Sequence, residues 1–76
     1  MPLKENINVS IYPGEEQGYV ATCDELNVVT QGPTLDKIVH NIQEALLLYL
    51  EGEDLIELGY INTPSVLITL EVKLFV

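Results

Sequence analysis

The spacing of apolar residues changes from every second residue to about every 3.6 residues at Thr34. Before Thr34 apolar and polar side chains alternate, which is typical of strands with one buried face. From Thr34 to about Glu51 the apolar residues follow the period of an amphipathic helix. Alternation returns after Pro64. With only 76 residues, this order predicts one domain, residues 1–76, in which a single helix packs on a sheet.

Three short strands are predicted before the helix. They cover residues 6–12, 19–23 and 28–31, and polar turns at 13–18 and 24–27 separate them. Connections this short make consecutive strands antiparallel neighbours. The first half of the chain is therefore predicted to be an antiparallel meander.

The ends of the helix carry recognisable signals. Thr34 is predicted to be the N-cap, Asp36 lies in the first turn near the positive end of the helix dipole, and Gly52 follows the last turn. After an irregular acidic segment, a final strand is predicted at residues 65–76. Its inward-facing row is expected to be entirely apolar and to comprise Val66, Ile68, Leu70, Val72, Leu74 and Val76.

A helix between two strands is long enough to return the chain across the sheet, so the last strand can lie parallel to the first and beside it. The predicted fold class is two-layer α+β with the order β-β-β-α-β. It has a three-stranded antiparallel meander, a fourth strand parallel to the first and one helix packed on one face.

The charge balance limits the partners that this chain can bind. Twelve Asp and Glu residues face three Lys and Arg residues, for a formal net charge of −9. Lys4, Lys37 and Lys73 are too few and too scattered to neutralise a phosphate backbone, so direct nucleic-acid binding is not expected. Acidity attracts basic partners, but it also keeps a protein in solution, and composition alone favours neither explanation.

Cysteine content and apolar runs indicate the compartment. Cys23 is the single cysteine, so the chain cannot form an intramolecular disulfide. The N-terminus has no apolar run of signal-peptide type, and no segment is as apolar as a membrane span. We expect a cytoplasmic protein that does not bind membranes.

Several residues carry groups that occur in catalytic or metal sites. Asp24 and Glu25 form a carboxylate pair in a turn, but neighbouring side chains in extended chain point apart, which favours a solvated turn. His40 flanks the apolar helix face without a nucleophile nearby in sequence, and Cys23 fits a buried apolar role. The acidic segment 51–57 lacks the spacing of a calcium loop. We expect no catalytic residue, no metal and no cofactor.

Apolar residues remain beyond those that the core requires. Of all residues, 47% are hydrophobic, and a chain this short cannot bury all of them. Leu47, Leu48 and Phe75 lie outside the predicted core faces and are interface candidates for a homo-oligomer, either a dimer or a tetramer. The tyrosines fit core and interface equally well: Tyr12, Tyr19, Tyr49 and Tyr60.

Four short segments share an order and spacing with a known family. They read GYVA at 18–21, CDEL at 23–26, GPTLD at 32–36 and NIQEA at 41–45. Together, over about residues 7–51, they resemble the HicB-like antitoxin domain, whose pattern is roughly G-Y-x-A-x-x-P-E-L, G-D-T-x-E-E-A and N-x-x-E-A.

The chain departs from that pattern at several positions. Asp24 stands where the family commonly has Pro, and Pro33 where it has Asp. Lys37 and Ile38 replace Glu and Ala. Because Lys37 occupies the third helical position, it cannot complete a capping box with Thr34.

The resemblance implies a partial RNase H-like fold and an antitoxin that covers the active site of HicA, a small basic mRNA-cleaving toxin. Many members also carry a C-terminal DNA-binding domain, for which this chain has no room, so we do not expect a repressor. The contact with a basic partner is expected among Glu15, Glu16, Asp24 and Glu25. A homo-oligomeric scaffold without a toxin is the alternative, and a metal-dependent nuclease is a weaker one.

Overall fold

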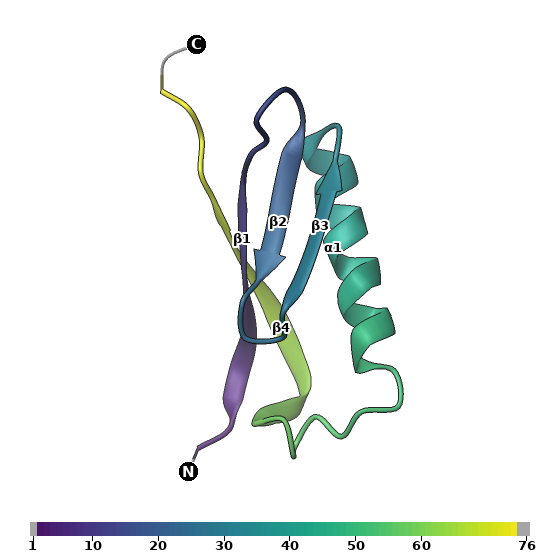
Figure 1. The fold of residues 1–76 in the computed structure, drawn as a ribbon. Coiled ribbons are helices and arrows are strands. Elements are labelled where there is room, and N and C mark those ends of the chain that lie inside the picture. Colours follow the sequence, from purple (N-terminus) through teal and green to yellow (C-terminus); the bar gives the residue numbers. More distant parts are fainter. Residues whose placement is uncertain (1, 75–76) are drawn as a thin grey trace.

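Each alternating segment of the sequence forms a strand of one mixed sheet (Figure 1). The computed structural model describes residues 2–74. Its elements are β1 (Lys4–Pro13), β2 (Tyr19–Cys23), β3 (Val28–Gly32), α1 (Leu35–Leu50) and β4 (Tyr60–Leu70). The strand order is β3-β2-β1-β4, with β4 parallel to β1 and the other pairs antiparallel. The predicted fold class is confirmed.

The core lies between one face of the sheet and α1. Alternate residues of β1 and β2 point inward and meet one stripe of the helix, as the two sequence periods predict. The buried apolar residues are Ile7, Val9, Ile11, Ala21, Cys23, Leu26, Ile38, Ile42, Leu46 and Tyr60.

The predicted signals at both ends of α1 are confirmed. The Thr34 hydroxyl accepts a hydrogen bond from the backbone N–H of Lys37 at 3.2 Å, which satisfies one of the free donors of the first turn. After the C-cap at Glu51, Gly52 adopts a left-handed φ of +80°, which a glycine reaches without strain.

Helix α1 lies over one half of the sheet. It packs mainly on β3 and β2, and the side-chain amide of Asn41 donates to the carbonyl of Gln31 at 3.0 Å. Figure 1 shows α1 beside β3. The strand order places β4 at the opposite edge of the sheet from β3. A helix is about 10 Å wide, whereas four strands span about 19 Å. The inward-facing residues of β1 are buried, whereas Val66 and Ile68 on the inner face of β4 are only half-buried, so the inner face of β4 is partly uncovered.

The start of the last strand differs from the prediction. β4 begins at Tyr60 rather than at Ser65, and it passes through Pro64. Tyr60 pairs with Lys4 and Ser65 with Asn6, so β4 advances by more residues than β1 over this irregular step. Proline lacks an N–H, and it is tolerated here because β4 is an edge strand with a register shift.

The end of the last strand also differs from the prediction. The N–H of Glu71 donates to the carbonyl of Ile11 at 2.8 Å, and beyond this bond the chain diverges from β1, which continues to Pro13 (Figure 1). Leu70, Val72 and Leu74 are 42%, 72% and 84% exposed. The prediction of a buried apolar row was wrong for these three residues, because they lie at or beyond the end of β4, where its pairing with β1 stops. Val76 lies outside the described residues.

Candidate partner-binding surface

The four acidic residues predicted to contact a partner do not form one group. Glu15 and Glu16 lie in the turn between β1 and β2, and Asp24 and Glu25 lie in the turn between β2 and β3. These turns are at opposite ends of the sheet in Figure 1. The five residues of β2 separate them by about 17 Å. The two pairs are therefore separate features.

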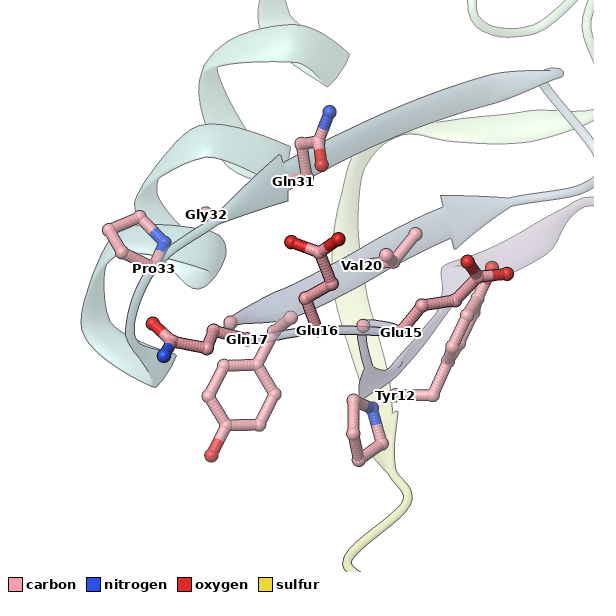
Figure 2. Close-up of a pocket in the computed structure, with 12 residues that line it drawn as sticks. Tyr12, Glu15, Glu16, Gln17, Val20, Gln31, Gly32 and Pro33 are labelled. Carbon is pink, nitrogen blue, oxygen red and sulfur yellow. The ribbon is translucent and has the colours of Figure 1, made fainter.

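A hollow of about 820 Å³ lies beside the β1–β2 turn (Figure 2). Part of its lining is a row of three side chains from adjacent strands, since Tyr12 pairs with Val20 and Val20 pairs with Gln31. This row lies on the face of the sheet opposite to α1, because the neighbouring residues Ile11 and Ala21 point into the core. The hollow thus opens on the uncovered face of the sheet.

Two carboxylates stand at the rim of this hollow. Glu15 and Glu16 are exposed, and within residues 2–74 neither forms an ion pair or a side-chain hydrogen bond. In Figure 2 the side chain of Glu16 extends from the turn toward Gln31. Carboxylates beside the ring of Tyr12 offer an ammonium or guanidinium group both a charged acceptor and an aromatic face.

Backbone geometry holds this turn in place. The N–H of Gly14 donates to the carbonyl of Gly18 at 3.0 Å. Gly18 has a φ of +78°, and a Cβ atom there would lie 2.6 Å from the carbonyl oxygen of Gly32. The turn therefore requires glycine both for its conformation and for the close approach of two backbones.

At the other end of the sheet, Glu25 is held by two hydrogen bonds. Its Oε1 accepts from the backbone N–H of Asn8 at 2.7 Å, and its Oε2 accepts from Nζ of Lys4 at 3.0 Å. Backbone groups of successive strand residues point to alternate sides of the strand. The carbonyl of Ile11 faces β4, so the N–H of Asn8, three positions earlier, faces the side of β2. At this level of the sheet β2 has already ended, at Cys23. The carboxylate thus satisfies a backbone group that has no strand partner.

These contacts change the acidity of Glu25. Burial of the side chain, which is 20% exposed, raises its pKa, but the Asn8 N–H and the Lys4 ammonium outweigh burial and hold the pKa below its ordinary value. Lys4 is 60% exposed and lies 5.7 Å from the ring centre of Tyr60. Glu25 is therefore a structural carboxylate in the described residues.

Tyr60 completes this cluster from β4. Its hydroxyl is buried and makes no hydrogen bond of good geometry within residues 2–74. Burial, followed by the nearby Glu25 carboxylate, raises the pKa of Tyr60 strongly. The phenol therefore stays neutral, and Tyr60 belongs to the core.

The other candidate residues have ordinary surroundings. Cys23 is buried, as predicted, and its burial raises the pKa of the thiol. Nε2 of His40 lies 3.4 Å from Oε2 of Glu44 on the exposed side of α1. Asp24 is exposed.

The predicted interface residues on α1 are on the surface. Leu47 and Leu48 are each 71% exposed. Phe75 lies outside the described residues.

Sequence reasoning missed the residues around Glu25. Lys4, Asn8 and Tyr60 are distant from it in sequence and meet it only because β1 pairs with both β2 and β4. The only signal in the sequence was that the parallel last strand would return beside the first.

The chain has no counterpart in the comparisons with known proteins. No protein-family model matches it, and it has no significant match among curated proteins or solved structures.

Within the part of the chain that the structure describes, no helix is both long and apolar enough to cross a membrane. In the same part, no three His, Cys, Asp or Glu side chains are grouped as metal ligands.

Proposed function

We propose that this protein is a binding module of the antitoxin type, which covers the cationic active site of a small basic partner such as a HicA-type mRNA-cleaving toxin. It catalyses no reaction, needs no cofactor and acts in the cytoplasm. The observation that supports this proposal is the hollow beside the β1–β2 turn, where Glu15 and Glu16 stand without ion-pair partners in the described residues.

Electrostatics explains why such a surface suits that partner. An RNA-cleaving protein presents Lys and Arg side chains to phosphates. Carboxylates at the rim of a hollow can occupy the same groups through charge-assisted hydrogen bonds, and a net charge of −9 raises the encounter rate.

The four predicted contact residues take different parts in this proposal. Glu15 and Glu16 make the principal contact at one end of the sheet. Asp24, which is exposed at the other end, contributes to long-range attraction only. Glu25 is held by Lys4 and Asn8, so its charge is already partly neutralised.

Co-expression with a small basic protein encoded next to this chain tests the function. We expect the two proteins to copurify and the toxin's growth arrest to be relieved. No copurification and no relief with any neighbouring basic protein would contradict the proposal.

Charge removal tests the contact. The double variant Glu15→Gln, Glu16→Gln is expected to associate at least about tenfold more slowly at low salt, because steering by nearby charges is lost. The control Asp24→Asn should change the rate by about twofold or less, since it removes one distant charge. Equal effects of both variants, measured by stopped-flow fluorescence, would place the contact elsewhere.

The alternative is a homo-oligomeric scaffold without a toxin partner. The exposure of Leu47 and Leu48 favours self-association. Copurification separates the two functions, because a scaffold retains no basic partner.

A further inference from the structure

The inner face of the sheet has an open groove where α1 does not cover it. The groove has a volume of about 700 Å³ and runs between α1 and the first half of β4. Its lining is mainly apolar and includes Leu46, Leu47, Leu50, Leu55, Pro64 and Val66.

One wall of this groove is itself an unpaired apolar surface. Leu47 lines the groove from the α1 side and is still 71% exposed, so most of its side chain contacts no other residue of the described chain. An exposed leucine therefore stands next to an apolar hollow. A two-fold axis beside α1 would bring Leu47 of each copy to the groove of the other, because such an interface uses the same patch twice.

We propose that this groove binds a second copy of the chain, with Leu47 of each copy seated against the β4 wall of its partner. The proposal concerns the inner face of the sheet. The carboxylates of the proposed toxin contact lie beside the opposite face, so both surfaces can be occupied at once and each can fail without the other.

The distribution of charge favours a second copy at this place. Two chains of net charge −9 repel each other, so they can meet closely only where carboxylates are scarce. Glu51 is the single charged residue among the described residues that line the groove. Added salt should therefore strengthen this association by screening the repulsion, whereas it weakens binding of a basic partner.

The available area limits the size of this interface. The eleven residues of β4 offer a strip about 36 Å long and one strand, about 5 Å, wide, or about 180 Å², because the inward-facing residues of β1 are already buried. The flank of α1 adds an area of similar size. Standard interfaces bury about 800 Å² on each partner and weak ones less than about 600 Å². We therefore expect a weak dimer in exchange with the monomer.

Leu48 provides a matched control. It has the same side chain and the same 71% exposure as Leu47, but it does not line the groove. Successive helical residues point about 100° apart, so Leu48 is directed away from the groove. An interface formed by α1 in general would use both leucines, whereas the groove uses only Leu47.

Sedimentation equilibrium over a wide concentration range tests the proposal. The weight-average mass of the wild type should rise from 8.5 kDa toward twice that value, and more readily at high salt. Leu47→Gln should raise the dissociation constant at least about tenfold, because two buried leucines are lost per dimer. Leu48→Gln should change it by about twofold or less.

A variant on the other wall makes the test independent of α1. Asn62 lies in β4, is exposed and lines the groove, so Asn62→Glu places a charge there and should also weaken the dimer at least about tenfold. Circular dichroism verifies that each variant is folded. The proposal is overturned by a wild-type mass of 8.5 kDa at every concentration, by equal effects of Leu47→Gln and Leu48→Gln, or by a dimer insensitive to Asn62→Glu.

Discussion

The two ends of the sheet carry similar acidic pairs that have different surroundings. At one end Glu15 and Glu16 extend from a turn whose geometry depends on Gly18, and within residues 2–74 they have no ion-pair partner. At the other end the Glu25 carboxylate binds Lys4 and the Asn8 N–H. The β1–β2 turn is held by backbone contacts, so its carboxylates are available to bind a partner. The β2–β3 turn uses the Glu25 carboxylate to stabilise the fold.

This difference shows why a count of acidic residues cannot identify a binding surface. A carboxylate that accepts two hydrogen bonds loses them if it turns to a partner, and that loss reduces the free energy of binding. An unpaired carboxylate has no such cost. The following variants test whether the two ends differ in this way.

The largest effect is expected at Gly18. In Gly18→Ala the new Cβ would lie 2.6 Å from the Gly32 carbonyl oxygen, in addition to the strain of a positive φ. We expect a loss of about 2–4 kcal/mol in the free energy of unfolding, measured with urea. Gly52→Ala is the matched control, because its φ of +80° is similar but no atom lies within 4 Å of its Cβ, so it should lose about 1 kcal/mol. Equal losses would mean that the β1–β2 turn relieves the clash by moving.

A smaller effect is expected at Glu25. Glu25→Gln at pH 7 weakens one charge-assisted hydrogen bond and removes an ion pair with a partly exposed lysine, for a loss of about 1–2 kcal/mol in the free energy of unfolding. Glu16→Gln, at the other end, should leave the stability unchanged within error. If both variants behave alike, Glu25 is not a structural carboxylate and the two ends do not differ.

The contribution of Glu25 should depend on pH. Its pKa is lower in the folded protein than in the unfolded chain, where it is about 4.3. Deprotonated Glu25 therefore stabilises the fold fully above about pH 4.3, and this contribution is lost as the pH falls through the folded pKa. Urea unfolding at several pH values between 7 and 3 should show the gap between wild type and Glu25→Gln closing. A gap that is constant with pH would contradict the proposed linkage.

The elements of the fold could be predicted because their signals are local. The change of period at Thr34, the cap at the same residue and Gly52 each depend on a few neighbouring residues, and all three match the structure. The ends of β4 could not be predicted, because they depend on pairing with β1: the strand passes through Pro64 on a register shift and ends at Leu70.

The candidate site was less predictable from sequence, although one part of it was implied. Consecutive turns of an antiparallel meander lie at opposite ends, so the predicted meander already separates Glu15 from Glu25. The partners of Glu25 could not be found this way, because Lys4 and Tyr60 approach it only through long-range pairing. The local sequence therefore predicts in which turn each carboxylate lies. Only tertiary contacts determine which carboxylates have a partner.

The smallest effect is expected at the hydroxyl of Tyr60. This group is buried beside Glu25 without a hydrogen bond of good geometry in the described residues, so its removal in Tyr60→Phe leaves no new unpaired atom. We expect stability equal to the wild type or up to about 1 kcal/mol higher, because an unsatisfied polar group is costly to bury. Tyr12→Phe, beside the open hollow, should change nothing in urea unfolding and serves as the control. A different result would be a loss of stability in Tyr60→Phe that disappears when Glu25→Gln is also present. It would mean that the phenol donates a hydrogen bond to the Glu25 carboxylate. This carboxylate would then accept hydrogen bonds from three donors rather than two.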